Sequence, residues 1–116
     1  MAIAERHIGS VTIVDLSGKL TSSDQSGKLK EKVDALLAQD RKQIVLNLGE
    51  VTYVDSAGLG EIVSCYSTAR RQSATVSLAN LHKRVQELLV ITKLHAVFDV
   101  YESEKAAIDS FAPATT

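Results

Sequence analysis

The chain has 116 residues, a length that fits one domain and is too short for two ordinary ones. Hydrophobic residues make up 45% and charged residues 23%, which excludes an intrinsically disordered chain and a fibrous repeat. The 13 Lys and Arg nearly balance the 14 Asp and Glu, so no strong field favours direct binding of nucleic acid or of an anionic membrane.

The composition and the N-terminus favour a cytoplasmic protein without membrane insertion. No apolar run approaches the ~20 residues that span a bilayer, and charges interrupt the apolar stretch that a signal peptide would need. The single cysteine, Cys65, has no intramolecular disulfide partner. Because His7, His82 and His95 also lack metal-ligand spacing, no metal or cofactor is expected.

The first strands are predicted from short apolar stretches. Residues 3–8 and 11–16 flank Gly9-Ser10, a two-residue turn signal of the kind that joins antiparallel strands. Residues 43–48 are almost continuously apolar and rich in branched side chains, as in an interior strand. The sequence therefore predicts a β-hairpin followed later by a buried strand.

A helix is expected between the hairpin and the buried strand. Two capping boxes fit its start, Ser22 with Gln25 or Thr21 with Asp24. Apolar residues then recur along one helical stripe, and the helix should end near Gln39.

The second half of the chain alternates helices and strands. The predicted elements are a helix from about 57 to 71, a strand at 74–79, a helical stripe at 85–89, a strand at 97–101, and a helix from the N-cap Ser103 to about 111. The order β-β-α-β-α-β-α-β-α predicts an α/β fold with a mixed, mostly parallel sheet. We expect one domain over residues 1–116, with its core at about 3–111 and a frayed tail at 112–116.

The segment between Leu48 and Ala57 is the candidate functional loop, because useful surface in such sheets lies beyond the carboxyl ends of the strands. Ser56 has two interpretations. It is a favoured N-cap residue for the following helix, or it accepts a phosphoryl group, which a helix N-terminus accommodates well. No enzyme motif is present, since Val54 replaces the first glycine of Gly-x-Ser-x-Gly and no Gly-Lys is followed by Ser or Thr.

Two stretches resemble a known family. Val51-Thr-Tyr-Val-Asp-Ser-Ala-Gly-Leu-Gly60, preceded by Ile44-Val-Leu-Asn-Leu48, resembles the core signature of the STAS domain of bacterial anti-sigma factor antagonists. Val11-Thr-Ile-Val-Asp-Leu-Ser-Gly-Lys-Leu20 is similar to the second strand of that family and its Gly-x-Leu end. The likeness covers about residues 3–111.

The resemblance implies a partner-switching function without catalysis. In the antagonist branch, the serine at the place of Ser56 is phosphorylated by a partner that is both anti-sigma factor and serine kinase. The unphosphorylated antagonist binds this partner, and a sigma factor is released. Phosphorylation breaks the complex, and a phosphatase of the PP2C type restores binding. ATP and magnesium would belong to the kinase. The partner-binding residues implied by the resemblance are Thr21, Ser22, Ser23, Asp24, Asp55, Ser56 and Gly58.

One position departs from the family pattern. Antagonists often carry Asp directly after Gly-x-Leu, whereas this chain has Thr21 there. STAS domains also serve as constitutive subunits of signalling scaffolds and lipid transport complexes, and in that alternative Ser56 would only cap its helix.

Overall fold

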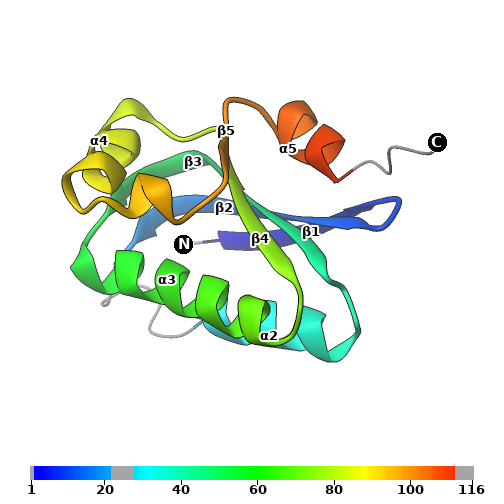
Figure 1. Ribbon diagram of the computed structural model, residues 1–116. Coiled ribbons are helices and arrows are strands. Elements are labelled where there is room, and N and C mark those ends of the chain that lie inside the picture. The colour runs from blue at the N-terminus through cyan, green and yellow to red at the C-terminus, as the bar shows by residue number, and fades with distance from the viewer. Residues whose placement is uncertain (1, 22–27, 112–116) are drawn as a thin grey trace.

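The computed structural model describes residues 2–21 and 28–111. Their elements, in chain order, are β1 Ala2–Ile8, β2 Val11–Leu20, α2 Lys28–Ala38, β3 Gln43–Val54, α3 Ser56–Arg71, β4 Thr75–Ala79, α4 Lys83–Ile91, the 3-10 turn η1 Leu94–Ala96, β5 Val100–Tyr101 and α5 Glu104–Ser110 (Figure 1). The sheet has the order β1-β2-β3-β4-β5, with β1 antiparallel to β2 and the other neighbours parallel. The predicted α/β fold with a mixed, mostly parallel sheet is therefore confirmed.

The N-terminal hairpin forms where the sequence predicted it. Ile8 pairs with Val11, so Gly9 and Ser10 make the two-residue turn. Gly9 has a φ of 58°, a left-handed conformation that glycine adopts without the steric cost of a Cβ.

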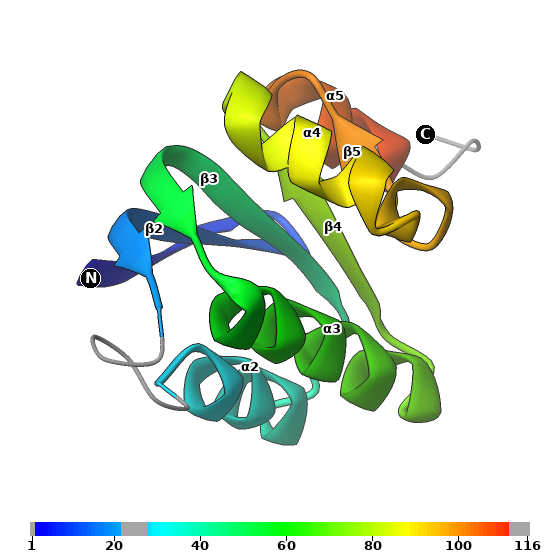
Figure 2. The same cartoon turned by 90° about the vertical axis from the view of Figure 1, so that its left-hand side faces the viewer.

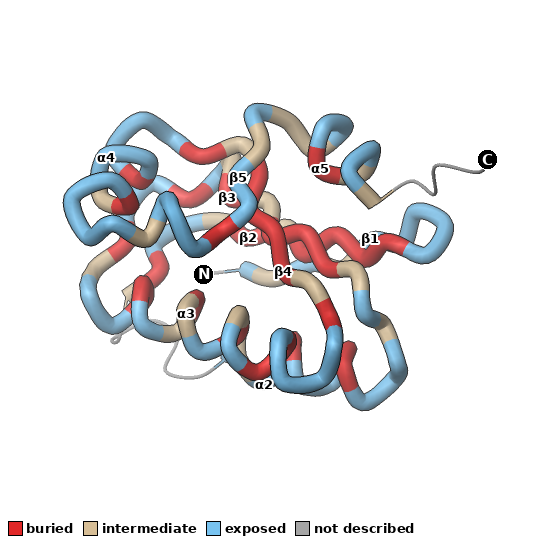
Figure 3. The backbone as a smooth tube through the Cα atoms, in the orientation of Figure 1, coloured by how far each residue is buried: buried red, intermediate tan, exposed pale blue. Residues whose placement is uncertain are grey.

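Helices cover both faces of the sheet. Figures 1 and 2 show α2 and α3 side by side along one face, with α5 on the opposite face. The larger apolar cluster joins α2, α3 and α4 to alternate residues of the strands, while a smaller cluster packs Ala107 of α5 against Val11, Ile13, Val45 and Ala79. This alternation follows from the two-residue side-chain period of a strand. Figure 3 shows that the interior strands consist largely of buried residues.

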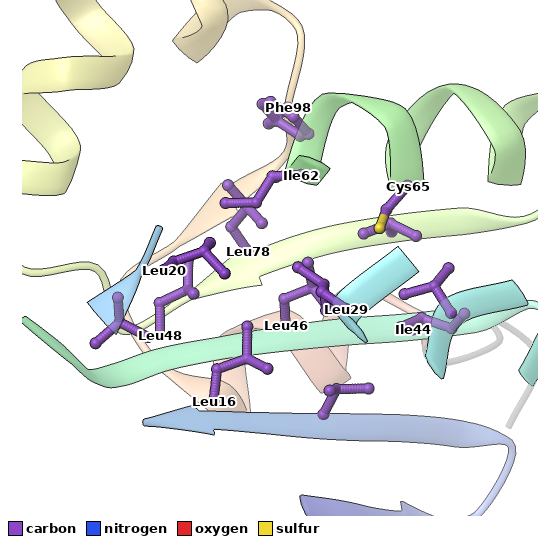
Figure 4. Packing of buried hydrophobic residues seen from close by; sticks show 14 of the residues in the cluster. Leu16, Leu20, Leu29, Ile44, Leu46, Leu48, Ile62, Cys65, Leu78 and Phe98 are labelled. Carbon is purple, nitrogen blue, oxygen red and sulfur yellow. The ribbon is translucent and has the colours of Figure 1, made fainter. Parts of the chain in front are cut away.

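The main core lies between the sheet and the pair α2 and α3. Figure 4 shows Leu46 and Leu48 of β3 and Ile62 and Cys65 of α3 within it. Burial raises the pKa of the Cys65 thiol to about 12, so this residue is a packing residue with an inert thiol.

Three strands, β2, β3 and β5, differ from their predicted lengths by more than one residue. β3 continues six residues past Leu48 to Val54, because β2 also continues to Leu20 and the two stay paired through two register shifts. The predicted loop between Leu48 and Ala57 is therefore wrong except for Asp55, since Ser56 already belongs to α3. β5 has only two residues of the predicted 97–101, because Val97 is the helical C-cap of η1 and the N-H groups of Val97 and Phe98 both donate to the Leu94 carbonyl.

The helix ends agree with the sequence patterns where they are described. α2 ends at Ala38, next to the predicted end at Gln39. Ser103 caps α5, since its hydroxyl accepts from the Ala106 N-H at 3.1 Å. The two capping boxes considered for α2 lie outside the described residues except for Thr21.

An ion-pair network fixes α5 to the hairpin. Arg6 on β1 donates to Asp15 on β2 through Nε at 2.5 Å and Nη2 at 2.9 Å, and it also pairs with Glu104 at the start of α5. Asn47 donates to the same carboxylate at 2.8 Å. The hydrogen bonds from Arg6 hold the pKa of the Asp15 carboxyl below its usual value.

We expect Asp15→Asn to lower the free energy of unfolding at pH 7 by about 1 kcal/mol. The pKa of the Asp15 carboxyl is lower in the folded protein than in the unfolded chain. Its contribution to the free energy of unfolding is therefore complete above the ordinary carboxyl pKa of about 3.9, and it is lost as the pH falls through the lower folded pKa. Urea titrations from pH 7 to pH 2 should therefore show the two proteins converging in acid. Asp109→Asn, which removes an exposed pair with Lys105 in α5, is the control and should change stability by less than about 0.5 kcal/mol.

Candidate functional site

Asp55 is the residue that caps α3. It has extended backbone angles, φ -96° and ψ -178°, and its Oδ1 accepts from the Gly58 N-H at 2.8 Å. The interpretation of Ser56 as the N-cap is therefore wrong. The physical reason is that β3 runs to Val54, so Asp55 is the single residue between strand and helix, and aspartate caps a helix as well as serine does.

Ser56 is the first residue of α3 and is exposed, which confirms its predicted exposure at a helix start. Its hydroxyl makes no hydrogen bond to another described residue, so it is available for chemistry. The first N-H bonded within the helix is that of Leu59, to the Asp55 carbonyl at 2.9 Å, and Asp55 takes the Gly58 N-H. The N-H groups of Ser56 and Ala57 thus remain as first-turn donors near this hydroxyl.

Gly58 faces the interior of the protein. A Cβ at this position would lie 2.0 Å from the carbonyl oxygen of Leu20 and 3.0 Å from its Cγ. The residue is buried, and its predicted role in partner binding stays a prediction. Gly58 lets α3 approach the end of β2.

The ends of β2 and β3 bring the two predicted segments together. Leu20 pairs with Val54, and the Asp55 N-H donates to the Leu20 carbonyl at 3.2 Å. Thr21, half-buried, therefore follows β2 beside the residue that caps α3. Ser22, Ser23 and Asp24 lie outside the described residues.

One contact that supports this region is long-range. Glu61 on α3 accepts from the Lys30 N-H at the start of α2 at 2.9 Å. The carboxylate thus satisfies a first-turn donor of a neighbouring helix. No local signal in the sequence marks a cap that is supplied from 31 residues away.

An apolar groove, also missed from the sequence, is lined in part by Val54, two residues before Ser56. It has a volume of about 400 Å³ and lies between the end of β3 and α4. Tyr53 is 48% exposed on one wall and Ile91 is 77% exposed on the other. The groove was missed because a loop was predicted between Leu48 and Ala57, whereas Tyr53 belongs to strand β3.

The three histidines have separate structural contacts. His82 precedes α4 and donates from Nε2 to the Gly49 carbonyl at 2.7 Å. His7 contacts Glu5 at 2.5 Å on β1, and His95 lies in η1. Within residues 2–21 and 28–111, no group of three His, Cys, Asp or Glu side chains is arranged to hold a metal ion.

No helix in the part of the chain that the structure describes is long and apolar enough to cross a bilayer.

A mixed five-stranded sheet with an exposed serine at the start of the helix after its third strand defines a particular class of small α/β domain. The family model of the STAS domain matches residues 2–107, and the chain belongs to the STAS domain family.

Relatives and solved structures agree with this assignment. The chain is 26% identical over 108 residues to the anti-sigma F factor antagonist of Paenibacillus polymyxa, covering 93% of this chain and 92% of the relative. It is 30% identical over 80 residues to the anti-sigma-B factor antagonist of Bacillus subtilis, covering 69% and 72% of the two chains. The structure of the Bacillus cell fate determinant SpoIIAA in its phosphorylated form shares the fold, with a TM-score of 0.73, 17% identity, and coverage of 96% and 100%.

Proposed function

We propose that this chain is a cytoplasmic anti-sigma factor antagonist that regulates transcription through partner switching. In this proposal it binds an anti-sigma factor that is also a serine kinase, and the bound partner releases a sigma factor. Phosphorylation of Ser56 ends the binding, and a PP2C-type phosphatase restores it. The names of the relatives support the antagonist class.

The observation that carries the switch is the position of the Ser56 hydroxyl. It is exposed at the first position of α3, while the neighbouring Asp55 supplies the cap. A phosphoryl group can therefore be added without removing a capping hydrogen bond. The free N-H groups of the first turn and the positive end of the helix dipole favour an anion there.

The same surface accounts for the sensitivity of binding to the modification. Ser56 lies two residues after Val54, which pairs with Leu20 at the end of β2 and also lines the groove formed with α4. Phosphate adds roughly -1.5 to -2 charges at neutral pH, next in sequence to the Asp55 carboxylate. A partner that packs against the unmodified surface would have to bury or neutralise this added charge.

We expect Ser56→Ala to abolish phosphate incorporation by the cognate serine kinase. The test is incubation of the purified protein with kinase, ATP and magnesium, followed by mass spectrometry of the intact chain and its peptides. Ser67→Ala, an exposed serine farther along α3, is the matched control and should be labelled like the wild type. Labelling of Ser56→Ala at the wild-type level would place the acceptor elsewhere, with Thr21, Ser22 and Ser23 as the first alternatives.

We expect Thr21→Asp to change partner affinity at least about threefold while changing the free energy of unfolding by less than about 0.5 kcal/mol. The reason is that Thr21 follows β2 beside Asp55, so a carboxylate there changes the charge that the partner meets. Calorimetric titration measures the affinity, and thermal unfolding measures the stability. Ser67→Asp adds the same charge away from the strand ends and should leave affinity unchanged. Unchanged binding by Thr21→Asp with a sharply lower Tm would make Thr21 a structural residue.

A further inference from the structure

A second cavity lies at the carboxyl ends of β4 and β5. It has a volume of about 500 Å³, within the range of about 300–1,000 Å³ common for ligand pockets. Its α4 lining residues are Gln86, Leu89 and Val90, whereas the groove near Ser56 is lined by Arg84, Val85, Glu87, Leu88 and Ile91. An α-helix turns by about 100° per residue, which places these two sets of α4 residues on opposite sides of the helix. The cavity is therefore separate from the groove.

Part of the lining of this cavity is apolar. Leu81, Leu89 and Phe98 are nearly fully buried and contribute to its lining. Val90 is 57% exposed and Val100 is 38% exposed, and both also line it. These residues present apolar surface to a bound group with an apolar body.

The polar lining consists mainly of hydrogen-bond acceptors. The Asp99 and Glu102 carboxylates have no ion-pair or hydrogen-bond partner among the described residues. Gln86 uses its Nε2 on the Leu81 carbonyl at 3.1 Å, which leaves its carbonyl oxygen as an acceptor. His95 makes a 3.4 Å contact from Nδ1 to the Leu89 carbonyl. Among the described residues, no Lys or Arg lines the cavity.

We propose that this cavity binds an organic cation with an apolar body, such as a guanidinium or amidinium group carried on a hydrophobic residue or ring. The apolar part of the lining takes the body, and the two unpaired carboxylates attract the charged end. Tyr101 adds an aromatic lining residue, to which cations are also attracted. This binding does not depend on Ser56, because the cavity lies on the other side of α4.

The test is an amide-resolved NMR titration of the isotope-labelled full chain with benzamidine, and with benzamide as its neutral analogue. We expect saturable shifts at Val90, Val100 and Tyr101, with benzamide binding about two- to fivefold more weakly, as the loss of one exposed ion pair implies. The double variant Asp99→Asn, Glu102→Gln should bind benzamidine as weakly as benzamide. Glu87→Gln removes a carboxylate from the opposite side of α4 and should bind like the wild type.

A second arm distinguishes the two sources of such a cation. A capped tripeptide with arginine between two leucines that binds more tightly than benzamidine indicates a segment of a partner protein, and the reverse order indicates a free organic cation. Equal affinity for benzamidine and benzamide, an unchanged double variant with a wild-type amide spectrum, or shifts confined to other surfaces would overturn the proposal.

Discussion

Phosphorylated protein, and Ser56→Asp to a smaller degree, should bind the anti-sigma partner at least tenfold more weakly than the unmodified protein. The added group meets the partner at an exposed helix start, two residues after Val54 of the apolar groove. Two unit charges about 4 Å apart repel by roughly 4 kcal/mol at an effective dielectric of 20, and like charges brought together in an interface cost several kcal/mol. Each 1.4 kcal/mol is a factor of ten in affinity, so even half of this repulsion, about 2 kcal/mol, would weaken binding by more than tenfold.

The fold should survive the same modification. The helix dipole stabilises an anion at this position by about 0.3–1 kcal/mol, and the hydrogen bond from Gly58 to Asp55 does not involve the serine hydroxyl. Titration calorimetry with the purified partner measures the affinity, and thermal unfolding checks the fold. Ser67→Asp, with its charge farther along α3, should bind like the wild type. Equal affinities for unmodified, phosphorylated and Ser56→Asp protein would favour the constitutive STAS subunit over the antagonist.

The fold was predictable because its strongest signals are local. The turn at Gly9, the apolar strand at 43–48 and the N-cap Ser103 each depend on neighbours within a few residues. The end of β3 was not predictable in this way. Its last six residues include Gly49, Glu50 and Thr52, which interrupt the apolar run, and they remain in the sheet because β2 extends beside them through two register shifts.

The candidate site shows the same division between local and long-range causes. The motif around Ser56 placed the serine at an exposed helix start, but the choice of Asp55 as the cap depended on where β3 ends. The contact from Lys30 to Glu61 and the groove between Tyr53 and α4 join residues far apart in the chain. Such features depend on how helices and strands are placed in space, which one sequence without related sequences does not define.

Gly58→Ala should destabilise the protein by about 2 kcal/mol or more, although alanine is the better helix former. A mid-helix Gly→Ala change alone stabilises by about 1 kcal/mol. At position 58, however, the new Cβ would lie 2.0 Å from the Leu20 carbonyl oxygen, which also accepts from the Asp55 N-H. Backbone must therefore move at the end of β2 and at the start of α3, and overpacking of this kind typically costs about 1–3 kcal/mol, occasionally more.

Gly60→Ala is the matched control, because it makes the same change two residues later in α3 where a Cβ meets no atom within 4 Å. It should raise the free energy of unfolding by about 0.5–1 kcal/mol. Urea titration should therefore move the midpoints of the two variants in opposite directions from the wild type. If Gly58→Ala were as stable as Gly60→Ala, the close approach of α3 to Leu20 would be absent in solution. A destabilised Gly58→Ala that also loses partner binding, while Gly60→Ala keeps it, would show that this contact holds the ends of β2 and β3 in the arrangement that the partner binds.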